Sequence, residues 1–169
     1  FVARGDVFTA PIEHGPTRNL TNSSNAHDRY ARWSPDGKNI AYIPDVSGEE
    51  QIYIVNQNGS GEHEQLTKEF SVRLNSLSWS PDRSFLSFVD KDSKLFIVNL
   101  QSKKVTEIAD DEFARGIYFD WSPNGGYIAL TLSNMNGYNS LYIYSISEAK
   151  LHRITDDYFN AYSPAWGSE

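Results

Sequence analysis

Four polar or positively charged residues each stand six positions before a tryptophan in this 169-residue sequence: His27, Arg73, Arg115 and Asn160. Their recurrence at one place predicts a partial ring of such groups at one opening of the fold. That chemistry suits peptide carboxylates or backbone carbonyls. Arg29 and Arg32 are weaker candidates of the same kind. The alternative interpretation is that loop arginines face water or neighbouring acids.

Nucleophilic catalysis finds no support in the sequence. A serine nucleophile of the α/β-hydrolase type stands in a Gly-x-Ser-x-Gly pentapeptide, and the sequence contains none. The segment "GSG" at Gly59–Gly61 is expected in a hairpin turn, where small residues serve the backbone. The four histidines are scattered and do not form a zinc motif: His14, His27, His63 and His152. We therefore predict no catalytic residue in this chain.

Two acidic pairs, Asp110/Asp111 and Asp156/Asp157, follow equivalent positions of the repeat described below. Adjacent carboxylates can attract a cation or raise one another's pKa, and the alternative is a solvated loop. We favour the solvated loop, and we predict neither a metal site nor a cofactor.

The composition limits the partners. A formal net charge of -7 and a pI near 5.1 argue against nucleic acid or an anionic membrane, because phosphate binding needs a basic surface. The chain has no cysteine, so no disulfide or thiol chemistry is available. Apolar stretches such as Leu141–Ile146 are far shorter than the ~20 residues of a membrane-spanning helix. We expect a soluble protein, and the compartment, cytoplasmic or periplasmic, stays open.

The tryptophans recur at a nearly constant spacing. Trp33, Trp79, Trp121 and Trp166 are separated by 46, 42 and 45 residues, a period typical of four-stranded propeller blades. Each of the first three ends a short strand and precedes a Ser-Pro-Asp or Ser-Pro-Asn turn, which leads into an alternating strand. The sequence predicts an all-β fold of antiparallel four-stranded blades. The tryptophans are expected to pack between blades, and the competing hypothesis is a row of ligand-stacking aromatics.

The turn glycines vary in one repeat. Gly37 and Gly125 occupy a turn position that accepts a positive φ, whereas Arg83 stands at the equivalent place in the middle repeat. The middle turn is therefore expected to be either strained or of another type.

The period divides the chain into a single propeller segment of three complete blades and two partial ones. The complete blades are expected at 30–67, 76–109 and 117–155, with the last three strands of a blade at 1–21 and the first strand of a further blade at 161–169. We favour a fragment of a larger propeller whose open edges pair with other chain or with another copy. A closed four-bladed ring, in which 161–169 completes 1–21, and a ring closed by two chains are the alternatives.

The segment "WSPDGKNIAYIPDVSGEEQIYIVN", Trp33–Asn56, resembles the WD40-like repeats called PD40. These occur in TolB, in prolyl-oligopeptidase-like propellers and in tricorn proteases. The opening is more selective, because Ala3–Phe8, Arg18–Thr21 and Trp33–Lys38 resemble the propellers of the tricorn family. The PD40 resemblance covers almost the whole chain, and the tricorn-specific part covers roughly the first third.

The tricorn resemblance implies a function that the residues alone do not. Tricorn proteases trim peptides to short products, with a serine-protease centre in a later part of the chain and two propellers before it. Their propellers act as gated channels, so this chain would be a non-catalytic segment that gates or guides peptides. The family's arginine doublet for the substrate carboxylate has no counterpart here, and no substrate-anchoring residue is carried over.

Two other functions stay open. One is a TolB-like scaffold that binds a protein segment with no protease attached, and the other is the propeller of a prolyl-oligopeptidase-like enzyme. The expected partners are peptides or protein segments, the rest of the parent protein, and a second copy paired through open blade edges.

Overall fold

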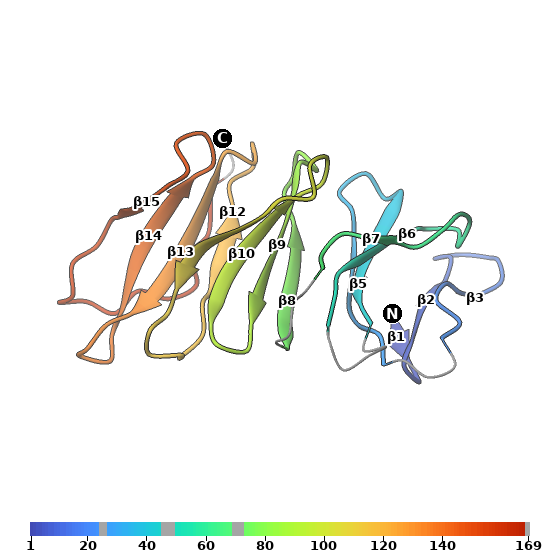
Figure 1. Cartoon of the computed structure of the whole chain (residues 1–169), viewed down its shortest axis with the longest axis horizontal. Helices are drawn as coiled ribbons and strands as arrows, with labels where there is room; N and C mark the ends of the chain where they lie inside the picture. Colours follow the sequence, from blue (N-terminus) through green and yellow to red (C-terminus); the bar gives the residue numbers. More distant parts are fainter. Residues whose placement is uncertain (24–26, 45–49, 69–72, 168–169) are drawn as a thin grey trace. The chain divides into compact units, whose positions relative to one another are not determined.

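The computed structural model describes residues 1–23, 27–44, 50–68 and 73–167. Its regular structure consists of β-strands that form one sheet of three strands and three sheets of four (Figure 1). Each sheet is a meander in which strands follow one another in sequence order. The all-β class and the propeller-type blades expected from the sequence are thus confirmed. Among the described residues, no helix is long and apolar enough to cross a membrane.

The chain divides into two compact units, Phe1–Trp79 and Ser80–Glu169. The first unit contains two sheets and one further strand: β1 (Val2–Ala3), β2 (Asp6–Thr9) and β3 (Arg18–Asn19); β4 (Arg29–Trp33), β5 (Asn39–Ile43), β6 (Tyr53–Asn56) and β7 (Glu64–Gln65); and β8 (Leu74–Trp79). The second unit contains β9 (Phe85–Asp90), β10 (Lys94–Asn99) and β11 (Val105–Asp110), then β12 (Phe119–Trp121), β13 (Tyr127–Ser133), β14 (Asn139–Ser145) and β15 (Lys150–Arg153).

The turn after each of the first three tryptophans is built in the same way. A buried serine donates its hydroxyl hydrogen to the Asp or Asn two residues later, and its Oγ accepts the backbone N–H five residues later. The Oγ–Oδ1 distances are 2.7 Å for Ser34–Asp36, 2.6 Å for Ser80–Asp82 and 2.8 Å for Ser122–Asn124. These bonds satisfy polar groups that the turn would otherwise bury, so each repeat closes its first hairpin locally.

The middle turn has the same geometry as the other two. Arg83 has a φ of 61°, close to the 69° of Gly37 and the 71° of Gly125. Its N–H donates to the Ser80 carbonyl at 3.0 Å, as the glycines do in their own turns. Of the two expectations for this turn, the strained one holds, because a side chain in the left-handed region is disfavoured.

Arg83→Gly is therefore expected to raise the free energy of unfolding by about 1 kcal/mol, because glycine adopts this φ without steric cost. Urea denaturation of the two proteins measures the difference. The reciprocal control is Gly37→Ala, whose added Cβ would meet no atom within 4 Å, so that only backbone strain acts and stability should fall. A loss of stability in Arg83→Gly would contradict the assignment of strain.

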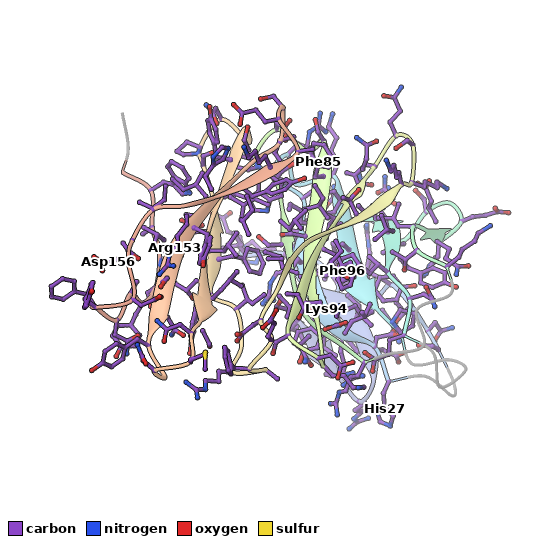
Figure 2. All side chains as sticks on the ribbon, turned by 60° about the vertical axis from the view of Figure 1, so that its left-hand side comes forward. His27, Phe85, Lys94, Phe96, Arg153 and Asp156 are labelled. Atoms are coloured by element: carbon purple, nitrogen blue, oxygen red, sulfur yellow. The ribbon has the colours of Figure 1, made fainter. Side chains whose placement is uncertain are left out.

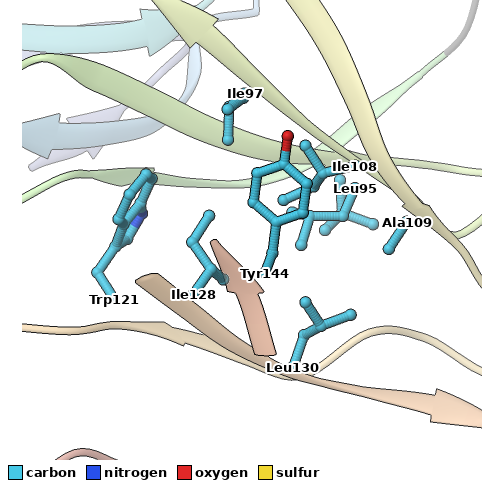
Figure 3. Packing of buried hydrophobic residues seen from close by; sticks show 9 residues of the cluster. Leu95, Ile97, Ile108, Ala109, Trp121, Ile128, Leu130 and Tyr144 are labelled. Atoms are coloured by element: carbon cyan, nitrogen blue, oxygen red, sulfur yellow. The ribbon is translucent and has the colours of Figure 1, made fainter. Parts of the chain in front are cut away.

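Each unit has its own apolar core. One cluster of buried apolar residues in the first unit comprises Val7, Leu20, Ile40, Tyr42 and Val55. A cluster in the second unit comprises Val89, Leu95, Ile97, Ile108, Ala109, Trp121, Ile128, Leu130 and Tyr144 (Figure 3). The second core takes side chains from β9–β11 and from β12–β14, so it lies between two sheets. Such packing explains why strands with apolar residues on both faces stack as blades.

Three of the tryptophans donate hydrogen bonds to residues of the preceding repeat. The Trp121 indole stacks on Phe85 with ring centroids 6.3 Å apart, and its Nε1 donates to the Ser87 hydroxyl at 2.9 Å. Trp79 Nε1 donates to the carbonyl of Arg32 at 3.1 Å. Trp166 Nε1 likewise donates to the carbonyl of Asp120 at 3.1 Å. The last two acceptors directly precede the tryptophan of the previous repeat, so the indole N–H links successive repeats.

Two details differ from the expected pattern. Trp33 is half exposed, at 50%, whereas Trp121 is buried at 6%. Residues 161–167 form no strand, although a first strand was expected at 161–169. A strand needs a hydrogen-bonded neighbour, and no other described strand pairs with these residues.

Candidate functional site

A cavity of about 590 Å³ opens in the first unit, where β4 and β8 begin and where β1 turns into β2. Five of the seven residues that line it are charged or polar. The lining residues are Val2, Gly5, His27, Asp28, Arg29, Glu50 and Arg73. His27 is exposed, and its side chain projects away from the strands (Figure 2). The cavity therefore joins two of the four residues that recur before the tryptophans.

The beginning of β4 is positioned by backbone bonds and by a bulge. The N–H of Asp28 donates to the carbonyl of Gly5 at 2.8 Å, which fixes it beside the turn between β1 and β2. The β4–β5 pairing shifts register between Arg29 and Arg32, and Tyr30 within the shift has a φ of 53°. A bulge of this kind redirects the neighbouring side chains, and here Arg29 lies at the cavity.

Glu50 connects the strands around the cavity. The residue is 6% exposed, and its side chain forms an ion pair with the guanidinium of Arg29. Its Oε2 also accepts the backbone N–H of Leu74, the first residue of β8, at 2.6 Å. One carboxylate thus holds β4 and β8 together and places Arg73 at the rim.

Asp28 is the most deeply buried charged group of the cavity, at 2% exposure. Its Oδ2 accepts the Ser23 hydroxyl at 3.0 Å. Within the described ranges, its Oδ1 has no hydrogen-bond partner, and neither has the buried Nε of Arg29. Burial raises the pKa of Asp28, although the hydroxyls of Thr21 and Ser23 oppose this effect.

The cavity unites three of the six ring candidates, namely His27, Arg29 and Arg73. Arg32 is exposed and its guanidinium donates to the carbonyl of Ala31 at 3.2 Å, so it does not line this cavity. The remaining two candidates belong to the second unit and have partners of their own.

Arg115 and Asn160 contact other residues of the second unit. The Arg115 guanidinium lies 5.6 Å from the ring centre of Phe113. Asn160 accepts the backbone N–H of Asn139 at 2.8 Å and donates to the Tyr162 hydroxyl at 2.6 Å. A single ring of His27, Arg73, Arg115 and Asn160 therefore stays a prediction.

Sequence reasoning missed Asp28 and Glu50. One signal for Asp28 was present, because the equivalent positions of the other repeats are Leu74, Gly116 and Ala161, none of which is charged. Glu50 carried no comparable signal, since its partners Arg29 and Leu74 are distant in sequence.

The acidic pairs serve internal contacts. Asp110 forms an ion pair with Lys94, with 2.9 Å between the lysine Nζ and the carboxylate Oδ2. Asp111 is buried and accepts the Ser133 hydroxyl at 3.0 Å. Asp157 accepts from Asn134 at 2.9 Å, and this bond and others hold its pKa below the usual range. In the part of the chain that the structure describes, no three His, Asp or Glu side chains are grouped as metal ligands.

Comparison with known proteins identifies the family. The family model described as "Tricorn protease second beta propeller domain" matches residues 1–169. The chain belongs to the family of tricorn second propeller domains. This match confirms the resemblance of the opening segment to tricorn propellers. Tricorn propellers are among the proteins that contain PD40 repeats, so the match also agrees with the PD40 resemblance.

Relatives of this tricorn-type propeller domain include a peptidase and a TolB protein. Dipeptidyl-peptidase 5 of Porphyromonas gingivalis is 25% identical over 115 residues, covering 63% of this chain and 17% of the peptidase. The Tol-Pal system protein TolB of Ruthia magnifica is 29% identical over 131 residues, covering 70% of this chain and 29% of TolB. The matches therefore span less than a third of either relative.

Solved structures share the fold of this propeller domain. The crystal structure of the tricorn protease matches with a TM-score of 0.82 at 20% identity, over 98% of this chain and 16% of that one. TolB from Acinetobacter baumannii matches with a TM-score of 0.65, also at 20% identity, over 89% of this chain and 37% of that one. At these identities the likeness establishes propeller blades.

Proposed function

We propose that this propeller segment has no catalytic centre of its own and guides peptides toward the chamber of a tricorn-like serine peptidase. The observation that carries the proposal is the charged cavity in the first unit of a tricorn-family propeller domain. The family match supports the peptidase context, and the cavity supports direct contact with peptides.

The chemistry of the cavity suits a polar chain. Arg73 is exposed at the rim, and in the described ranges it pairs with no carboxylate. Its guanidinium can donate to backbone carbonyls or to a carboxylate of a passing peptide. Weak, reversible contacts of this kind suit a passage, because a tightly bound peptide would block it.

A TolB-like scaffold is the second candidate function. The observation that favours it is the 29% identity to a TolB protein over 131 residues. Such a scaffold would bind a segment of one particular partner protein, whereas a peptide guide should accept many short peptides of unrelated sequence.

The test is a titration of the purified chain with a set of unrelated short peptides, in which isothermal titration calorimetry or NMR measures binding. We expect weak binding of most peptides, and Arg73→Ala should weaken it about fivefold to tenfold, which corresponds to about 1 kcal/mol, the net value of one ordinary hydrogen bond. Arg18→Ala removes another exposed arginine that does not line the cavity, and it should leave the affinity for peptides unchanged.

Three results would count against this function. Binding of a single peptide sequence would favour the TolB-like scaffold. Equal effects of Arg73→Ala and Arg18→Ala on peptide affinity would exclude the cavity as the binding site. Peptide hydrolysis by the chain alone, abolished by one serine or histidine substitution, would contradict a non-catalytic segment.

A further inference from the structure

Two residues that line the cavity in the first unit, Asp28 and Arg29, each carry an unsatisfied polar atom. Asp28 Oδ1 and Arg29 Nε are both buried, and neither has a hydrogen-bond partner in the described part of the chain. Both residues line the cavity. Leaving such groups buried and unpaired costs free energy. A ligand that offers one donor and one acceptor would relieve both atoms once the two side chains turn toward it.

The unpaired Oδ1 of the Asp28 carboxylate would be best satisfied by a positively charged donor. Asp28 is 2% exposed, and no lysine or arginine among the described residues forms an ion pair with it. The nearby cation Arg29 is already paired with Glu50. Burial raises the pKa of Asp28, which agrees with an ionised form that lacks sufficient stabilising contacts.

The size and polarity of the cavity narrow the ligand further. About 590 Å³ exceeds the space of a single ion and accommodates several residues of a peptide. At a peptide amino terminus, an ammonium group and the first carbonyl oxygen lie within one residue of each other. A lysine side chain offers the same ammonium with only methylenes beside it, so the donors of Arg29 and Arg73 would gain no acceptor.

Resting on the proposed function, we propose that this cavity recognises the free amino terminus of a peptide. The Asp28 carboxylate accepts the α-ammonium group, and the Arg29 and Arg73 guanidinium groups donate to the first carbonyl oxygens. The propeller would then orient peptides with their amino terminus held in the first unit.

Paired peptides test this proposal: a short alanine peptide with a free amino terminus, the same peptide with an acetylated amino terminus, and an acetylated version that contains one lysine. Each is titrated by calorimetry into the purified chain. Acetylation should weaken binding at least tenfold, and the lysine should not restore it. This comparison uses the unaltered protein, so it does not depend on the folding of any variant.

Asp28→Asn completes the test, because asparagine keeps the shape of the side chain and an acceptor for Ser23. The variant should bind the free peptide as weakly as the acetylated one, while its affinity for the acetylated peptide stays unchanged. Glu62→Gln, which neutralises an exposed carboxylate of the same unit, should change neither affinity. Circular dichroism melting confirms that both variants are folded.

The outcomes separate the two proposals. Equal binding of the free and acetylated peptides would overturn recognition of the amino terminus and leave peptide guiding intact. If the lysine restored binding of the acetylated peptide, recognition of the amino terminus would also be overturned, because any ammonium group would then suffice. Failure of every peptide to bind would overturn the proposed function together with this inference.

Discussion

Trp121→Ala should lower the free energy of unfolding by about 3–5 kcal/mol, the usual cost of removing a buried aromatic side chain. The indole is 6% exposed, stacks on Phe85 and donates to the Ser87 hydroxyl at 2.9 Å. Its loss leaves a void between two sheets and a serine without its donor.

Urea denaturation, followed by far-ultraviolet circular dichroism, measures this effect. Trp33→Ala is the matched control, because the same side chain is removed at a position that is 50% exposed. It should cost about 1 kcal/mol or less. Equal losses in the two variants would show that Trp121 does not carry the packing between its sheets.

Glu50→Gln should destabilise the chain by about 3 kcal/mol, the order of magnitude for removing one partner of a buried ion pair. The amide still accepts the Leu74 N–H through its carbonyl oxygen, so β8 keeps that bond. The Arg29 guanidinium, however, loses the charge that compensates it, and its Nε already has no partner among the described residues. The cost arises from a partly buried cation that has lost its counter-charge.

Thermal and urea denaturation of Glu50→Gln measure the loss. The control is Asp92→Asn, which breaks an ion pair with Lys91 whose side chains are both 52% exposed. Exposed pairs contribute about 1 kcal/mol or less. A cost for Glu50→Gln as small as that of the control would indicate that water reaches Arg29 and replaces the carboxylate.

Much of the fold was predictable because its determinants lie close together in sequence. The spacing of Trp33, Trp79 and Trp121 and the turns that follow them indicated four-stranded repeats, and each turn closes through bonds that span at most five residues. Alternating apolar residues then placed the hairpins. Short-range hydrogen bonds and strand alternation are properties that a sequence displays directly.

The candidate site was predictable only in part. His27, Arg29 and Arg73 were singled out and share one cavity, whereas Arg32 donates to Ala31 and Asn160 to Tyr162. Position in the repeat indicated which residues occupy equivalent loops. It did not indicate which of these side chains form hydrogen bonds with their own neighbours.

The sequence by itself determined the architecture, a series of β-propeller blades in which a Ser-Pro-Asp or Ser-Pro-Asn turn closes the first hairpin. Only the tertiary structure decided that Asp28 is buried with one oxygen that has no partner among the described residues, that Glu50 joins β4 to β8, and that residues 161–167 form no strand. The physical reason is range: a turn or an alternating strand is fixed by neighbours a few residues away. The burial of a charge and the pairing of a strand depend on groups that the folded chain brings from elsewhere.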